Sequence, residues 1–116
     1  MKRFSTNRVG VDQGSLMMFS HYDSGGVMWT AKGAREVRRI ITFAEPFLAP
    51  PAVHVGMTLW DIDQSTNPRA DLTADKVSES GFELVFRTWA DTRIARIRAD
   101  WMAIGALRDD DMWDVD

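Results

Sequence analysis

Alternation between apolar and polar side chains is the strongest structural signal in this sequence, and it is clearest between residues 94 and 104. Positions there fall into an apolar and a charged set: Ile97, Ala99, Trp101 and Ala103 against Arg96, Arg98 and Asp100. Because consecutive side chains of a strand point to opposite sides, this pattern predicts a half-buried strand with a charged outer face. Helical spacing is hard to find elsewhere in the chain, so the sequence predicts an all-β fold.

Other segments repeat this alternation between groups of turn-forming residues. We predict strands at 36–43, 53–60, 70–75 and 81–89, with one or two more from 10–20 and 27–29. The polar connector 90–93 has the length of a hairpin loop, and 61–69 is a loop rich in Asp, Ser, Asn and Pro. About six short strands separated by such frequent turns are typical of an antiparallel β-sandwich.

Length and charge narrow the class of protein. The 116 residues suit a single domain. Within it we expect 1–34 to supply the N-terminal strand or strands and a loop that complete the sandwich, 35–105 to form the core, and 106–116 to form an acidic tail. The net charge of −3, from 14 basic and 17 acidic side chains, argues against a nucleic-acid-binding surface. The chain contains no cysteine, so a disulfide framework and a thiolate metal site are both excluded.

The distribution of apolar residues bears on location. No apolar run reaches the length of a spanning helix, and none follows the basic start of the chain. We therefore expect no membrane insertion and no signal peptide, which leaves a protein that is cytoplasmic at synthesis or is exported or released by a non-classical route. The acidic tail is most simply a solubilising end, although Met112, Trp113 and Val115 leave docking on a partner open.

Six short motifs occur in an order that resembles the H-type lectin family, which includes snail agglutinins and the C-terminal domain of slime-mould discoidins. The motifs are ITFAEPF (41–47), PPAV (50–53), DIDQSTNPR (61–69), SGF (80–82), TWADT (88–92) and DWMAI (100–104). Together they cover residues 35–105 in uninterrupted register. None is specific alone, but the ordered set is.

The resemblance implies a six-stranded antiparallel β-sandwich that assembles as a homotrimer or as a hexamer of two trimers. It also implies binding of galactose-type sugars, above all N-acetylgalactosamine (GalNAc), in shallow sites between protomers. The family's sugar-contacting arginine falls on Arg69 and its tryptophan on Trp89. Three positions depart from the family: Ala90 replaces a contacting histidine, Lys32 aligns with a contacting aspartate, and Ala95 replaces an aromatic residue.

The residue chemistry at these positions suits a sugar. A site for a neutral sugar needs a flat aromatic ring, a rigid multiple donor and an acceptor, and Trp89, Arg69 and Asp91 supply the three. The structural alternatives are a strand-end tryptophan that packs under a loop, and an arginine that holds the fold through an ion pair with Asp61 or Asp63. Lys32 with Arg69 would instead favour an anionic saccharide.

The acidic loop before Arg69 admits two interpretations. Asp61, Asp63 and Asn67 supply the oxygens that calcium prefers, yet the loop lacks the glycine and terminal glutamate of the known motif. We therefore expect a turn held by Asx hydrogen bonds, with Asp61, Asp63 and Asn67 supporting Arg69, and no metal or other cofactor.

No pattern in the sequence supports catalysis. His21 and His54 lack the spacing of a metal pair or of a base beside a nucleophile, and Asp61 and Asp63 are too close in sequence to face each other across a glycoside. The sequence thus predicts a non-enzymatic lectin that acts in multivalent adhesion or agglutination. The alternative is a structural, assembly or adhesion module of a larger particle in which the sugar site has degenerated.

Overall fold

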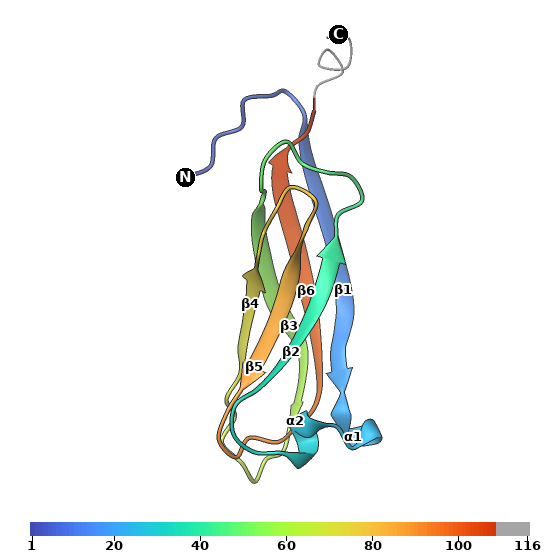
Figure 1. The fold of residues 1–116 in the computed structure, drawn as a ribbon, viewed down its shortest axis with the longest axis vertical. Helices are drawn as coiled ribbons and strands as arrows, with labels where there is room; N and C mark the ends of the chain where they lie inside the picture. The colour runs from blue at the N-terminus through green and yellow to red at the C-terminus, as the bar shows by residue number, and fades with distance from the viewer. Residues whose placement is uncertain (109–116) are drawn as a thin grey trace.

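The computed structural model describes residues 1–108. Over this range the chain forms six strands and two short helical turns: β1 (Val9–Ser20), α1 (His21–Ser24), α2 (Val27–Thr30), β2 (Arg35–Thr42), β3 (Ala52–Ile62), β4 (Asp71–Asp75), β5 (Gly81–Thr88) and β6 (Ile94–Ala106). The strands make two antiparallel sheets, with strand orders β1-β6-β3 and β2-β5-β4 (Figure 1). The predicted all-β sandwich is therefore confirmed, whereas most of the acidic tail, with Met112, Trp113 and Val115, lies outside the described residues.

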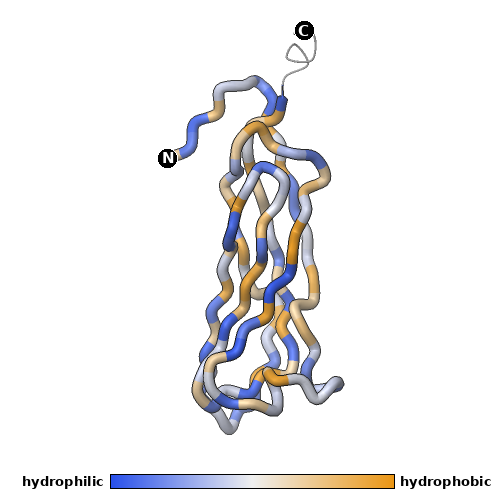
Figure 2. The backbone as a smooth tube through the Cα atoms, in the orientation of Figure 1, coloured by the Kyte–Doolittle hydropathy of each residue, from blue (hydrophilic) through white to orange (hydrophobic). Residues whose placement is uncertain are grey.

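The core lies between the two sheets and is built from the alternation that the sequence displays (Figure 2). The middle strands contribute most of it: Phe82, Leu84 and Phe86 from β5, and Ile97, Ala99 and Ala103 from β6. Trp101 joins this core from its edge, because its ring lies 5.5 Å from that of Phe82. Gly14 of the neighbouring strand is needed there, since a Cβ atom at this position would lie 2.7 Å from the Trp101 indole nitrogen.

The predicted strand at 27–29 is wrong, because these residues belong to α2. Gly25 adopts a left-handed conformation (φ 69°), which lets the chain reverse after α1. The Met28 N–H then donates to Nδ1 of His21, at 3.1 Å, and the Met28 side chain is fully buried. Burial also lowers the pKa of His21. This histidine therefore stabilises a turn, a role that alternation in three residues could not reveal.

The connector 90–93 is not a hairpin loop, because β5 and β6 belong to different sheets. Each is the middle strand of its own sheet, so both of its edges are already paired: β5 with β2 and β4, β6 with β1 and β3. The connector consequently crosses from one layer to the other at one end of the sandwich. Its length suited a hairpin, but length does not decide which strands pair.

The outer faces of the two sheets differ. On β2-β5-β4, the guanidinium of Arg38 pairs with Glu36 at 2.8 Å, with Glu83 at 2.8 Å and with Asp75 at 3.0 Å. On β1-β6-β3, the exposed apolar side chains are Val9, Val11 and Met102 in the half nearer the termini, and Met17 in the other half. No helix in the described part of the chain is long and apolar enough to cross a membrane.

Candidate functional site

The candidate site lies at the end of the sandwich opposite the start of the chain (Figure 1). Three segments meet there: the segment between α2 and β2, the loop between β3 and β4, and the crossing connector between β5 and β6. Backbone hydrogen bonds join them. The Gly33 N–H donates to the Ala90 carbonyl at 2.8 Å, and the Asp63 N–H donates to the Arg93 carbonyl at 2.9 Å. The predicted site residues Arg69, Trp89 and Asp91 all belong to this end.

Arg69 is fixed by the connector rather than by its own loop. One of its terminal nitrogens, Nη1, donates to the Asp91 carboxylate at 2.6 Å and to the Thr92 hydroxyl at 3.1 Å. An ion pair does hold Arg69, but its partner is Asp91: the expected partners are wrong, because Asp61 pairs with Arg96 and Asp63 with Arg93. A quarter of the Arg69 side chain is exposed, and Nη2 and Nε take no part in the contacts to Asp91 and Thr92. These two nitrogens can donate to a ligand.

Asp91 is held in its ionised form. The hydrogen bond from Arg69 lowers the pKa of this carboxyl, and the charges of Arg69 and Lys32 act in the same direction. Lys32 is exposed, lies on the segment before β2, and forms no salt bridge within the described residues. Three of the predicted residues, Arg69, Asp91 and Lys32, therefore interact electrostatically at one place.

The three residues expected to support Arg69 play separate parts. Asp61 pairs with Arg96 at 3.2 Å, so its predicted role beside Arg69 is wrong. Asp63 accepts hydrogen bonds from the backbone and hydroxyl of Ser65, which confirms the Asx turn, and it also pairs with Arg93 at 3.3 Å. The hydrogen bonds from Ser65 lower the pKa of Asp63.

Asn67 supports the site through its backbone. Its carbonyl accepts the hydroxyl hydrogen of Thr92, the residue that also accepts from Arg69. Thr92 is fully buried, so this chain of hydrogen bonds fixes the side of Arg69 that faces the protein. Within residues 1–108, no three His, Asp or Glu side chains converge as a metal site would require.

Trp89 follows β5 directly, and almost half of its surface is exposed (47%). The Thr88 hydroxyl donates to the Arg69 carbonyl at 2.6 Å, which holds the start of the connector against the Arg69 segment. Asp71 pairs with Arg87 in the β4–β5 register, so continuing that register by two residues sets Arg69 opposite Trp89 on the same face. No described residue bonds to the indole N–H or stacks on the ring. This exposure argues against the alternative that Trp89 is a structural residue packed under a loop.

Ala90 and Ala95, which stand where the resemblance places a histidine and an aromatic residue, have different surroundings. Ala90 has a left-handed backbone (φ 59°), which strains any residue with a Cβ atom. Its carbonyl accepts hydrogen bonds from the Gly33 N–H and from Arg35. Ala95, at the position of the family's aromatic residue, is buried, with 6% of its surface exposed.

The sequence analysis missed Arg35, a residue that joins the segments of the site. Arg35 is buried (8% exposed), and its guanidinium donates to the carbonyls of Val27, Met28, Gly33 and Ala90. Burial without a carboxylate partner lowers its pKa. In the alternating pattern of β2, Arg35 falls on the same side as Val37 and Ile41, which pack against the core. A charged residue on this inward-facing side was the signal that could have identified it.

Trp29 and Arg93 form a second missed contact at the same end. The Arg93 guanidinium lies over the Trp29 ring, 4.2 Å from its centroid, and donates to the Trp29 carbonyl at 3.0 Å. Tyr22 meets Trp29 edge-on at 5.1 Å. These contacts attach α1 and α2 to the connector and so rigidify the surroundings of Asp91.

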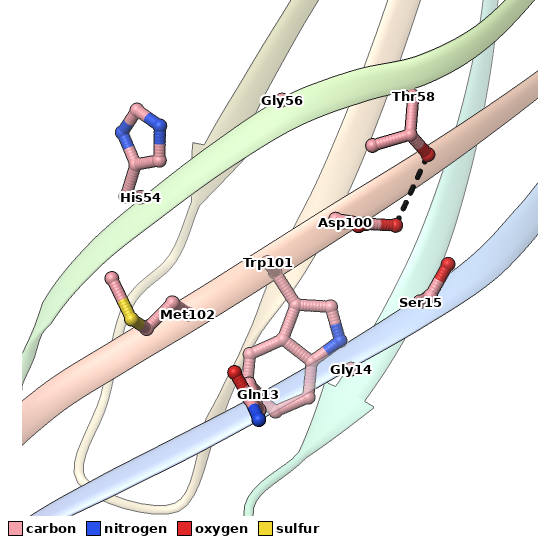
Figure 3. A pocket seen from close by; sticks show the side chains of 9 residues that line it. All are labelled: Gln13, Gly14, Ser15, His54, Gly56, Thr58, Asp100, Trp101 and Met102. Carbon is pink, nitrogen blue, oxygen red and sulfur yellow. Dashed lines mark hydrogen bonds between the residues drawn. The ribbon is translucent and has the colours of Figure 1, made fainter.

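A separate hollow of about 610 Å³ lies on the outer face of the β1-β6-β3 sheet (Figure 3). Asp100 stands in its middle and accepts a hydrogen bond from Thr58 at 3.1 Å, while His54, Met102 and Gln13 border it. Gly56 leaves it open, since a Cβ atom there would meet nothing within 4 Å. None of the predicted sugar-contacting residues lines this hollow.

Comparisons with known proteins agree on the fold. Residues 38–104 match the model of the H-type lectin domain. Wild-type discoidin II from Dictyostelium discoideum is similar in structure, with a TM-score of 0.75 at 21% identity over 91% of this chain. The chain spans 39% of the length of that protein. A tailspike protein, gp49 of Pseudomonas phage LKA1, is less similar, with a TM-score of 0.53 at 18% identity over 87% of this chain and 15% of its own.

A curated relative from Fuscovulum blasticum is 54% identical over 108 residues, which are 93% of this chain and 94% of the relative. It is described as "ATP synthase subunits region ORF 7", a name that states no activity. The relative therefore extends the similarity to almost the whole chain without adding a function.

Proposed function

Because the chain belongs to the H-type lectin domain family, we propose that it binds carbohydrate through Arg69, Trp89 and Asp91 at the connector end of the sandwich. The observation that carries this proposal is that a fixed Arg69 guanidinium and an exposed, unpartnered indole belong to segments held together at one end of the sandwich. A planar donor with free N–H groups holds sugar hydroxyls, and an indole covers the apolar face of a sugar ring. The protein carries out no reaction in this proposal.

The sugar we propose is of the galactose or GalNAc type. The Asp91 carboxylate accepts hydroxyl hydrogens while it also orients Arg69, and Lys32 stands where the family has an aspartate. An anionic saccharide is the variant that Lys32 and Arg69 together would favour. Binding of such a sugar weakens steeply with salt, whereas binding of a neutral sugar does not.

We further propose a homotrimer whose protomers meet through the outer face of the β1-β6-β3 sheet, with a hexamer as its larger form. The exposed apolar side chains of that face support this arrangement, because contiguous apolar surface marks protein contacts. Several weak sites on one rigid assembly bind a glycan-coated surface tightly through effective concentration. The resulting activity is multivalent adhesion or agglutination.

The test is a glycan array with the Arg69→Ala variant, which we expect to lose binding while its circular dichroism spectrum stays that of wild type. Arg96→Ala is the matched control: Arg96 also pairs with one aspartate, Asp61, but outside the cluster. We expect this control to bind as wild type does. Equal binding by Arg69→Ala and wild type would reject the site.

A second candidate is an assembly or adhesion module of a larger particle, with the sugar site degenerate. Ala90 and Lys32 support it, since each replaces a residue that contacts sugar in the family, and so does the structural similarity to a phage tailspike protein. This candidate expects wild type to bind no glycan on the array while its oligomer remains intact in analytical ultracentrifugation.

A further inference from the structure

Beside Trp89, on the outer face of the β2-β5-β4 sheet, lies a hollow of about 450 Å³. It is lined by Trp89 together with Arg35 and Glu36 of β2, Asp71 of β4 and Arg87 of β5. Arg69 and Asp91 do not border it. Trp89 thus belongs both to the proposed site and to this second concave surface.

The side chains of this hollow are not equally engaged. Both carboxylate oxygens of Glu36 are used, one by Arg38 at 2.8 Å and the other by Arg87 at 2.9 Å. The hydrogen bond from Arg38 is the main reason why the pKa of Glu36 is lowered. Asp71 differs, because its nearest cation, Nη1 of Arg87, is 3.8 Å away, which is beyond hydrogen-bond distance.

Asp71 and Trp89 therefore retain free binding capacity toward the hollow. Almost half of the Asp71 side chain is exposed (47%), and no described residue donates a hydrogen bond to it. The Trp89 indole N–H likewise has no acceptor in the described part of the chain. A carboxylate acceptor, an arginine donor and an aromatic ring are the three groups with which proteins hold sugars.

The guanidinium of Arg35 turns inward to the carbonyls of Val27, Met28, Gly33 and Ala90, so the charged groups that the hollow presents are those of Arg87, Glu36 and Asp71. Arg38 and Arg87 neutralise Glu36, which leaves the Asp71 carboxylate as the available acceptor. An anionic ligand is repelled by this carboxylate, whereas a neutral polyhydroxylated ligand finds an acceptor in Asp71 and a donor in the Trp89 indole N–H. The chemistry of the hollow thus favours a neutral sugar unit.

We propose that this hollow is a second sugar subsite, which takes the unit next to the terminal sugar of a glycan chain that crosses Trp89. The proposal rests on the proposed function, since the terminal unit contacts Arg69 and Asp91. It makes the preferred ligand a neutral disaccharide or longer glycan rather than a monosaccharide. Asp71 accepts from the hydroxyls of the second unit and Trp89 contacts both units.

The experiment compares GalNAc and galactose with neutral disaccharides that end in the same sugars, by titration calorimetry. We expect wild type to bind the best disaccharide about tenfold more tightly, since one or two additional net hydrogen bonds supply this gain. Asp71→Ala should lose the gain and keep the monosaccharide affinity. Asp75→Ala is the matched control, because Asp75 lies on the same strand and face, pairs with Arg38, and does not border the hollow.

Each outcome decides between the two proposals. Loss of the gain in Asp71→Ala alone supports the subsite. The subsite is overturned if no disaccharide exceeds its monosaccharide in wild type, if Asp71→Ala weakens both ligands equally, or if Asp75→Ala loses the gain as well. In all three cases monosaccharide binding stands, and so does the proposed function. A folded wild type that binds neither ligand overturns both.

Discussion

The middle strands of the two sheets, β5 and β6, differ in how far their outward-facing apolar residues are exposed to water. On β5, Val85 points away from the core and is nevertheless fully buried, with Arg38 and Thr73 as its cross-strand neighbours. On β6, Met102 points away from the core and 37% of its surface is exposed. Around its middle strand, one face is therefore covered by its own charged side chains, with Ile40 exposed on the edge strand, whereas the other leaves the middle-strand residue Met102 partly in water.

The two sheets therefore differ in how their outer surfaces are shielded from water. Long charged side chains bridge the strands of β2-β5-β4 and exclude water from the apolar residue beneath them, since their stems are themselves apolar. The outer face of β1-β6-β3 has small or apolar residues in the half nearer the termini and a hollow around Asp100. Exposed apolar surface of this kind is typical of protein contacts, which is why we propose the contact between protomers on this face.

The largest expected effect is dissociation of the oligomer by a charge on the exposed face. Val11 on β1 is 60% exposed, so Val11→Asp costs the isolated chain little and leaves an unpaired carboxylate in the contact. We expect the variant to sediment as a monomer at concentrations where wild type is a trimer. Analytical ultracentrifugation measures this directly.

Ile40→Asp is its control on the other face. Ile40 is also a β-branched residue on an edge strand, and 80% of its surface is exposed. We expect the Ile40→Asp oligomer to match wild type. If the Ile40→Asp variant dissociated and the Val11→Asp variant remained an oligomer, the protomers would meet through the β2-β5-β4 sheet. That result would contradict the assignment made from the two outer faces.

A smaller effect distinguishes the two middle strands. Val85→Ala removes two buried methyl groups, so we expect it to lower the free energy of unfolding by roughly 2 kcal/mol. Because Val85 lies within one protomer, the loss should not depend on protein concentration. Met102→Ala acts through assembly, so its loss of stability should be largest at concentrations where wild type is assembled and should disappear where wild type is a monomer. Urea titrations at two protein concentrations check this, and a concentration-dependent loss in Val85→Ala would contradict it.

Most of the fold could be predicted from the sequence, since it follows from local pattern. The period of two in β5 and β6 placed the core residues on the correct face, and the ordered motifs identified the sandwich. The pattern failed at 27–29 and at the connector 90–93. In both places the outcome depends on distant partners: the His21 ring that accepts from Met28, and the strands that already pair with β5 and β6.

The site was predictable in its residue types and not in its pairings. Arg69, Trp89 and Asp91 were named from chemistry and family position, and they lie at one end of the sandwich. The ion pair of Arg69 with Asp91, rather than with Asp61 or Asp63, depends on how the connector crosses between the layers. Arg35 was not predicted, because it donates only to backbone carbonyls. Such an arginine has no acidic partner that could be recognised in the sequence.

The smallest effect tests whether the charges of the covered face stabilise it. Hydrogen bonds from Arg38 are the main cause of the lowered pKa of both Glu36 and Asp75. A carboxyl whose pKa is lower in the folded protein contributes stability that is present above the unfolded pKa and is lost as the pH falls through the folded value. Wild type should therefore lose thermal stability as the pH falls from about 5, since unfolded carboxyls titrate near pH 4.

Removing the shared cation should flatten that dependence. In Arg38→Met the carboxyls of Glu36 and Asp75 lose the partner that lowers their pKa, so we expect a smaller decrease in Tm between about pH 5 and pH 3. Arg39→Met is the control, because Arg39 donates to the Met17 carbonyl and pairs with no carboxylate in the described residues. Calorimetric scans of the three proteins give the slopes. If Arg38→Met keeps the wild-type slope, the ion pairs cover Val85 without stabilising the fold, and packing alone distinguishes the two faces.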